Sequence, residues 1–198
     1  MINIIDIGLG NVRSIEHWLS RSDLHYKRVS KSKDFSDSPI IIPGVSSAGA
    51  YMCKLRETGI DKEIVERSNR GQKIIGICLG FQILTNYSQE DGGTECLGIL
   101  NGSTKYINGC KVHNGWVPFS YDTRRLSENT HFKKQRKKTV SGRVYFNHEL
   151  SVSLEHMPNG DVLDNGITSF VIQENIFGFQ FHPEKSQNTG QELLELII

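Results

Sequence analysis

The chain has 198 residues, of which 37% are hydrophobic and 23% are charged, and its formal net charge is +1. This length is enough to bury a substantial core and predicts a single domain spanning residues 1–198. The nearly neutral charge argues against bulk affinity for nucleic acid or an anionic membrane. No apolar run approaches the roughly 20 residues of a membrane span.

Charge is unevenly distributed along the second half of the sequence. Residues 101–150 carry 10 basic and 3 acidic side chains, whereas residues 151–198 carry 1 basic and 7 acidic side chains. The densest basic run is Lys133-Lys134-Gln135-Arg136-Lys137-Lys138. No interleaved aromatic residue or recognition motif accompanies it, so we interpret it as a solvated loop or hairpin, with a nucleic-acid patch as the alternative.

The cysteine pattern and the N-terminus indicate a cytoplasmic protein. The four cysteines, Cys53, Cys78, Cys96 and Cys110, form no C-x-x-C pair and no zinc-like spacing with histidine. Residues 2–6 open directly into a strand-like run, without the basic and apolar regions of a signal peptide. Gly8-Leu9-Gly10 lacks the third glycine of a dinucleotide-binding fingerprint, so we expect neither a metal nor a cofactor.

The first half of the sequence alternates strand and helix patterns. Apolar runs predict strands at 2–6, 25–29, 40–42 and 73–77, and helical spacing predicts helices at 48–55, 61–69 and 79–86. Ile15, Trp18 and Leu19 also recur at helical spacing, after the first strand. This alternation is typical of a doubly wound, flavodoxin-like α/β fold, with a mostly parallel sheet and helices on both faces.

The amino-acid composition changes after Ser88, where glycine and asparagine become frequent. Short runs at 111–112, 144–146 and 168–173 predict antiparallel strands and thus a small antiparallel sheet beside the main one. A further strand at 177–181 runs into His182, and a helix at about 190–198 follows.

The segment Gly76-Ile77-Cys78-Leu79-Gly80 is a G-x-C-x-G motif at the junction of a predicted strand and a predicted helix. It is the thiol counterpart of the G-x-S-x-G nucleophile elbow, in which glycines allow a sharp turn that exposes the central side chain. The start of the helix favours the thiolate of Cys78, and the Leu79 N–H is expected to face a developing oxyanion. The alternative is a buried cysteine between two structural glycines.

A thiol nucleophile needs a base, and His182 is the best candidate among the seven histidines. His182 ends the last apolar strand and is followed by Pro183 and Glu184. The carboxyl ends of parallel strands meet at one edge of a sheet, so His182 is expected beside Cys78. Glu184 is placed to accept from the other ring nitrogen and to fix the tautomer. Taken alone, His-Pro-Glu is also typical of a turn with a solvated histidine.

Together, residues 76–82 and His182-Pro183-Glu184-Lys185-Ser186 resemble the two signatures of the triad, or class I, glutamine amidotransferases. Within that family the sequence is most similar to the glutaminase subunits of imidazole glycerol phosphate synthases. The features that carry this similarity are segments 6–11, 42–45, 115–116 and 145–148, and the long form of the histidine motif.

The resemblance implies roles for individual residues. The triad is Cys78, His182 and Glu184; oxyanion and substrate contacts come from Leu79, Gly44, Val45, Gln82 and His148; and the partner interface includes Lys185, Asn11 and Trp116. It further implies glutamine as the substrate and a (β/α)₈-barrel cyclase as the heterodimer partner that receives the ammonia.

The sequence also departs from the family pattern. Ser46, Ser47 and Ala48 stand where a glycine, a small residue and Phe are usual, and Glu149-Leu150 replaces Ser-Tyr after His148. Val112, Asn114 and Val117 differ around Gly115-Trp116. Three alternatives therefore stay open: a paralogue that supplies ammonia to another amidation, such as amidino-sugar synthesis; a non-catalytic regulatory subunit; and a hydrolase or peptidase on the same elbow.

Overall fold

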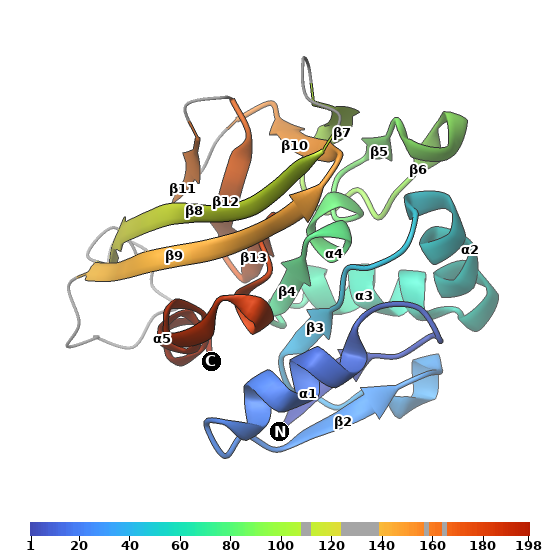
Figure 1. Cartoon of the computed structure of the whole chain (residues 1–198). Helices are drawn as coiled ribbons and strands as arrows, with labels where there is room; N and C mark the ends of the chain where they lie inside the picture. The colour runs from blue at the N-terminus through green and yellow to red at the C-terminus, as the bar shows by residue number, and fades with distance from the viewer. Residues whose placement is uncertain (108–111, 124–138, 157–158, 164–165) are drawn as a thin grey trace.

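A computed structural model describes residues 1–107, 112–123, 139–156, 159–163 and 166–198. Cys110, Lys111 and the basic run at 133–138 lie outside the described residues. Along the chain, strands and helices alternate as far as residue 82, and the following part is mostly strands (Figure 1).

The largest sheet of the described chain has seven strands: β1 (Ile2–Ile5), β2 (Tyr26–Val29), β3 (Ile40–Ile42), β4 (Ile74–Ile77), β11 (Asn159–Val162), β12 (Thr168–Gln173) and β13 (Ile176–Phe179). Their spatial order is β11-β12-β13-β4-β3-β1-β2. The pairs from β13 to β2 are parallel, and β12 and β11 extend the sheet antiparallel. Isoleucine-rich sequences suit β1, β3 and β4 because parallel strands are covered on both faces.

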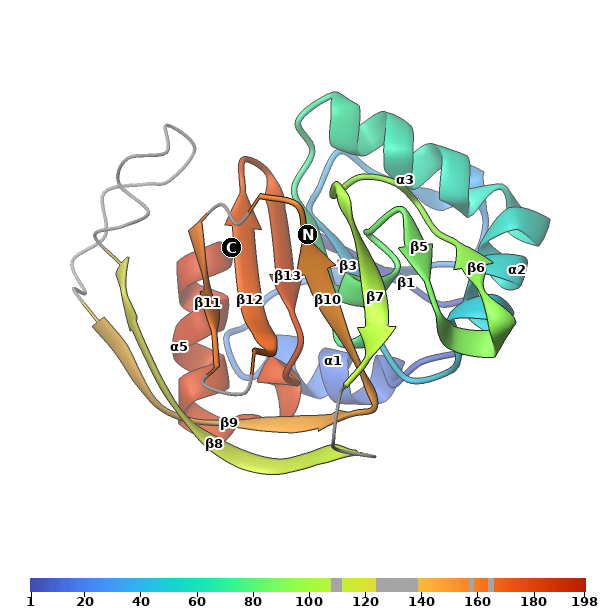
Figure 2. The same ribbon diagram turned by 90° about the horizontal axis from the view of Figure 1, so that it is seen from above.

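Helices cover both faces of this sheet and confirm the predicted doubly wound fold. The helices are α1 (Val12–Ser20), α2 (Ala48–Thr58), α3 (Ile60–Asn69), the single turn α4 (Leu79–Gln82) and α5 (Gln187–Ile197). α1 and α5 lie on one face, and α2 and α3 lie on the other (Figure 2). Ile75 and Ile77 of β4 pack toward α1 and α5, whereas Ile74 packs toward α2 and α3.

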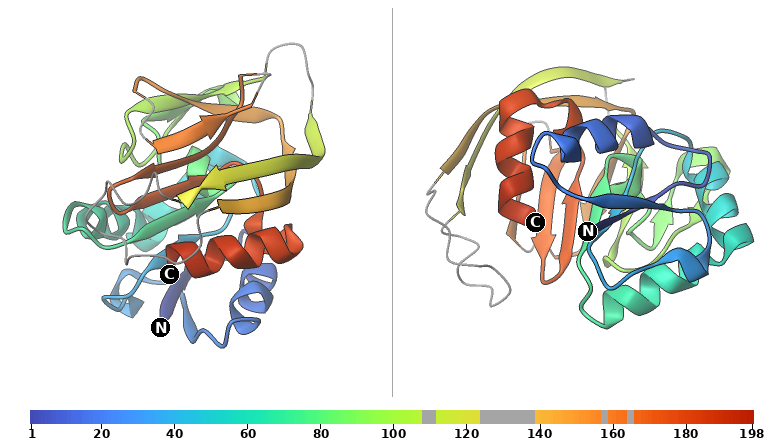
Figure 3. Two further views of the ribbon diagram at one scale, coloured as in Figure 1. Left: turned by 90° about the vertical axis from the view of Figure 1, so that its left-hand side faces the viewer. Right: turned by 90° about the horizontal axis from the view of Figure 1, so that it is seen from below.

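Two smaller sheets flank the main one. β5 (Tyr87–Ser88), β6 (Thr94–Glu95), β7 (Gly102–Tyr106) and β10 (Leu150–Leu154) form a mixed sheet, in which β5 and β7 are parallel. β8 (His113–Asp122) and β9 (Thr139–His148) form an antiparallel ribbon that curves over α5 (Figure 3). The ribbon also reaches the end of the main sheet, where Tyr145 forms a bridge with His182.

Three predicted elements differ from the structure. The helix predicted at 79–86 ends at Gln82, because the carbonyl groups of Ile83 and Leu84 accept hydrogen bonds from the amides of residues 97, 99 and 100 instead of continuing the helix. Val112 precedes β8 instead of lying in a strand, and the run at 168–173 joins the main sheet as β12. In the part of the chain that is described, no helix has the length and hydropathy needed to cross a membrane.

Candidate active site

The register of three parallel strands brings the predicted site together. Ile42 of β3 lies opposite Gly76 of β4, and Ile77 of β4 lies opposite Phe179 of β13. The residues that follow these strands therefore leave the sheet at the same edge. The segments that begin with Pro43, Cys78 and Gln180 all meet at this carboxyl edge, as expected for a doubly wound sheet.

Cys78 occupies a strained turn between β4 and α4. Its backbone has φ 52° and ψ −109°, and positive φ is unusual for a residue with a side chain. A Cβ on Gly76 would collide with the backbone of Gly80 and Phe81, and a Cβ on Gly80 would overlap the Ile42 carbonyl. The turn therefore requires both glycines, as predicted, and it leaves Cys78 7% exposed beside a pocket.

His182 and Glu184 form a buried pair. The His182 Nδ1 atom lies 2.7 Å from Glu184 Oε1, and the two side chains are 2% and 0% exposed. The His182 backbone is fixed because its N–H donates to the Tyr145 carbonyl and its carbonyl accepts from the Ser186 hydroxyl. The pair is thus held by β9 on one side and by the turn at Pro183–Lys185 on the other.

Cys78 lines the same cavity as this histidine and interacts with it. Burial by itself lowers the pKa of His182, but hydrogen bonds and charge interactions with Cys78 and Glu184 outweigh it and raise the pKa to about 9. The imidazole is consequently charged at neutral pH, between a thiol on one side and a carboxylate on the other. This arrangement favours a thiolate–imidazolium pair, the form in which a cysteine is nucleophilic.

A cavity of about 250 Å³ opens beside Cys78. Its size lies below the roughly 300–1,000 Å³ of pockets that bind drug-sized ligands, so it suits a molecule as small as an amino acid. All five predicted oxyanion and substrate residues line it, namely Gly44, Val45, Leu79, Gln82 and His148, together with Cys78 and His182.

Gly44 lies directly against the elbow. A Cβ at this position would overlap the Ile77 carbonyl and approach the Leu79 amide, so only glycine fits. Leu79 begins α4, where backbone N–H groups have no partner within the helix. The peptide groups at Gly44–Val45 and at Leu79 thus flank Cys78, where an oxyanion would form.

Gln82 and His148 form the inner wall of the cavity. The Gln82 amide nitrogen donates to the Leu150 carbonyl at 2.9 Å. The same carbonyl accepts from His148 Nδ1 at 2.7 Å, which leaves His148 Nε2 to accept from His113 Nδ1 at 3.0 Å. Burial lowers the pKa of His148 to about 4, so its ring is neutral.

The cavity also contains residues that the sequence did not single out. Glu90 lines it and accepts a 2.7 Å hydrogen bond from the Ala48 amide at the start of α2. Burial raises the pKa of Glu90, and the nearby carboxylates of Asp91 and Glu149 add to the effect. Asn147 also lines the cavity, as do Ser46 and Glu149, two positions at which the sequence departs from the family pattern. The acidic Gln89-Glu90-Asp91-Gly92-Gly93 turn was the one available signal for Glu90.

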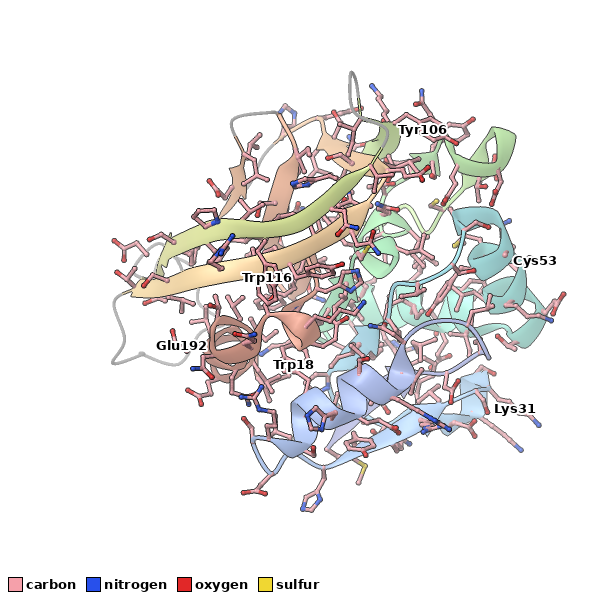
Figure 4. All side chains as sticks on the ribbon, in the orientation of Figure 1. Trp18, Lys31, Cys53, Tyr106, Trp116 and Glu192 are labelled. Atoms are coloured by element: carbon pink, nitrogen blue, oxygen red, sulfur yellow. The ribbon has the colours of Figure 1, made fainter. Side chains whose placement is uncertain are left out.

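Of the three predicted interface residues, the structure places Lys185 at the cavity and the other two away from its lining. Lys185 is exposed and lines the cavity, with its Nζ 5.8 Å from the centre of the Tyr145 ring. Trp116, labelled on β8 in Figure 4, is 38% exposed and packs against Tyr145, outside the cavity. Asn11 is half-buried and contacts Glu184 instead of the cavity.

Comparison with known proteins identifies the family. Residues 3–197 match the family described as glutamine amidotransferase class-I. The chain belongs to this family. As a class I glutamine amidotransferase, it is a triad glutaminase, which is consistent with the Cys78–His182–Glu184 cluster at the edge of the sheet.

Individual relatives of this amidotransferase refine the comparison. The imidazole glycerol phosphate synthase subunit HisH of Oceanobacillus iheyensis is 36% identical over 205 residues, covering 98% of this chain and 96% of its own. HisH of Geobacillus sp. (strain WCH70) is 33% identical over 210 residues, covering 98% and 94%. A solved structure of PurLQS from Thermotoga maritima matches with a TM-score of 0.74 at 22% identity, covering 99% and 96%, and supports the fold.

Proposed function

We propose that this amidotransferase is the glutaminase subunit of an imidazole glycerol phosphate synthase. It acts as a single domain over residues 1–198 in the cytoplasm, and it supplies ammonia to a (β/α)₈-barrel cyclase in histidine biosynthesis. The proposal is supported by nearly full-length similarity to HisH subunits. The observation that carries the chemistry is the buried cluster of Cys78, His182 and Glu184 beside a cavity of amino-acid size.

In the proposed reaction, the Cys78 thiolate attacks the side-chain amide carbon of glutamine. The C–N bond breaks as the His182 imidazolium donates its proton to the leaving nitrogen, which departs as ammonia. Neutral His182 then takes a proton from water, and the resulting hydroxide attacks the glutamyl thioester to release glutamate. Glu184 keeps Nδ1 of His182 protonated throughout, so that Nε2 handles the moving proton.

The tetrahedral intermediates of both steps carry an oxyanion. In this proposal the Leu79 N–H and the peptide at Gly44–Val45 donate to it. The peptide can rotate because Gly44 has no side chain, although the space around Gly44 is tight. A partner that docks on exposed Val45 would therefore control whether the Gly44–Val45 peptide donates to the oxyanion.

The cavity suits the positive charge of a free amino acid. The Glu90 carboxylate lines the cavity, where it would attract an α-ammonium group, and Gln82 and neutral His148 also line it. A substrate that lacks the ammonium group would leave Glu90 without a counter-charge.

The proposed docking face consists of Val45 and Lys185, which line the cavity, together with Trp116 and Asn11, which do not. Two of these residues, Val45 at 50% and Trp116 at 38%, expose large apolar side chains. Exposed aromatic and apolar residues beside a lysine are typical of a protein interface. A barrel cyclase on this face would receive ammonia directly from the cavity.

A paralogous role is the second candidate, and Glu149 favours it. The Glu149 carboxylate lines the cavity, close enough to Glu90 to add to the rise in the pKa of Glu90. Glutamine brings an α-carboxylate into the same space, so the cavity is less well matched to it than a hydroxyl-lined one would be. Such a glutaminase would feed a different synthase, for example in amidino-sugar formation.

Complementation separates the two candidates. The gene is expressed in a strain that lacks its own HisH but retains the barrel cyclase, and growth without histidine is measured. Growth that depends on Cys78 supports the histidine-pathway role. Failure to grow, together with glutaminase activity of the purified protein, would support the paralogue. Absence of activity with any partner would favour a regulatory binding subunit.

A further inference from the structure

Asn11 stands at the start of α1 but does not cap it. Asparagine at a helix N-cap usually accepts a hydrogen bond from a backbone N–H of the first turn. In the described part of the chain, no such side-chain bond is made at α1. Instead, the Asn11 amide nitrogen donates to Glu184 Oε1 at 2.5 Å, across 173 positions of sequence.

This contact falls on the oxygen that also serves the histidine. Glu184 Oε1 accepts from both Asn11 Nδ2 and His182 Nδ1, and the carboxylate is fully buried. Among the described residues, Glu184 Oε2 and Asn11 Oδ1 have no hydrogen-bond partner. Both hydrogen bonds that fix the rotation of the carboxylate are therefore made by one oxygen, Oε1. Turning the Asn11 amide over would place Oδ1 against that oxygen, so the assigned orientation is the attractive one.

The loop that carries Asn11 is held in place. Gly10 adopts φ 100° and lies against Pro43, so that an added Cβ would sit 3.1 Å from the proline ring. Pro43 leads into Gly44 of the oxyanion segment. The Asn11 amide is thus placed by the main sheet edge itself and does not depend on a long flexible side chain.

We propose that Asn11 is a positioning residue for the triad: its amide fixes the Glu184 carboxylate in the rotation that orients His182. The inference rests on the proposed glutaminase function for its kinetic readout. It assigns Asn11 a role within this chain, in addition to the predicted place at the docking face.

The test uses three substitutions with matched properties. Asn11→Ala removes the donor. Asn11→Ser also removes it, because serine is too short to reach Glu184, but keeps a good N-cap for α1. Asn11→Asp places a second carboxylate beside Glu184. Each variant is assayed for glutamine hydrolysis with the cyclase partner present, next to wild type and Cys78→Ala. The pH dependence of Cys78 alkylation by iodoacetamide, followed on the Cys78 peptide, needs no glutaminase activity.

The proposal predicts that Asn11→Ala and Asn11→Ser both lower kcat by roughly tenfold to a hundredfold, as expected for a hydrogen bond to a charged group, with KM little changed. In Asn11→Asp kcat falls further, because the new carboxylate repels the Glu184 carboxylate. In Asn11→Ala the pKa of His182 rises, because the Glu184 carboxylate then has His182 as its sole donor. The part of the alkylation pH profile that reports the His182 proton therefore moves to higher pH.

Two results would overturn the proposal. Wild-type kcat in Asn11→Ser with a loss in Asn11→Ala would reduce Asn11 to helix capping. An alkylation profile that is the same in Asn11→Ala and wild type would show that the amide does not act on the pair. If wild type hydrolyses no glutamine, the proposed function fails, and the alkylation profile alone decides the role of Asn11.

Discussion

Replacing Glu184 with glutamine removes the charge behind the His182 ring while keeping the shape of the side chain. The amide oxygen can still accept from Nδ1 at the position of Oε1, 2.7 Å away, and from Asn11. The variant therefore isolates the electrostatic part of the interaction. Both side chains are buried, so solvent does not screen the pair strongly.

The magnitude follows from this geometry. Two unit charges about 4 Å apart interact by about 4 kcal/mol at an effective dielectric constant of 20, which corresponds to roughly three pKa units. Relaxation of the site reduces this figure, so we expect the pKa of His182 to fall by about one to three units from its value of about 9. We expect kcat to fall roughly tenfold to a hundredfold, since a hydrogen bond to a charged group is worth about 1.5–3 kcal/mol.

The assay is glutamate formation across a pH range that extends above about 9, with the barrel partner present. Loss of the imidazolium as pH rises through the His182 pKa ends protonation of the leaving nitrogen, so the alkaline limb moves to lower pH in Glu184→Gln. Glu66→Gln is the matched control, because its carboxylate pairs with Arg70 on the exposed surface of α3. An unchanged alkaline limb and kcat in Glu184→Gln would refute the electrostatic role of Glu184.

Three further changes test other parts of the site. Gly44→Ala should abolish turnover, because the new Cβ overlaps the Ile77 carbonyl; calorimetry must show a folded protein, and retained turnover would argue against the oxyanion segment. His148 has a folded-state pKa of about 4, below its ordinary value of about 6.5, so its contribution to stability is present above pH 6.5 and is lost as pH falls toward 4. The pKa shift corresponds to about 3 kcal/mol of unfolding free energy. In His148→Gln the unfolding free energy, measured with urea, should therefore fall less steeply between pH 6.5 and 4. The same pH dependence in variant and wild type would contradict a buried neutral His148. Glu149→Ser should lower KM for glutamine several-fold, which corresponds to about 1 kcal/mol of binding free energy, because one carboxylate is removed from the cavity. A higher KM would instead show that Glu149 binds the substrate.

The sequence predicted the sheet edge and the residues that meet there for a physical reason. Isoleucine runs at 40–42 and 74–77 are long enough to be recognised as strands buried on both faces, and each is followed at once by the residues of the site. Parallel order then brings Gly44, Cys78 and His182 to one edge without further information. The G-x-C-x-G spacing reported the turn because only glycine fits the two flanking positions.

Other parts of the site depend on contacts that no local pattern carries. Glu90 reaches the cavity because a turn folds back onto the start of α2, 42 positions earlier in the chain. His113 meets His148 through the register of β8 and β9. The strands β5 and β6 have two residues each and are too short to show an alternating pattern. The Asn11–Glu184 contact joins the two ends of the chain.

The central claim is that the thiol at the elbow and the buried imidazole together hydrolyse glutamine. The most direct measurement is trapping of the thioester: the purified chain and its barrel partner are incubated with labelled glutamine, quenched in acid and analysed by mass spectrometry of the Cys78 peptide. We predict a glutamyl adduct on Cys78 that is absent from Cys78→Ala and that accumulates with slow turnover in Glu184→Gln. Steady glutamate release that persists in Cys78→Ala would contradict the account.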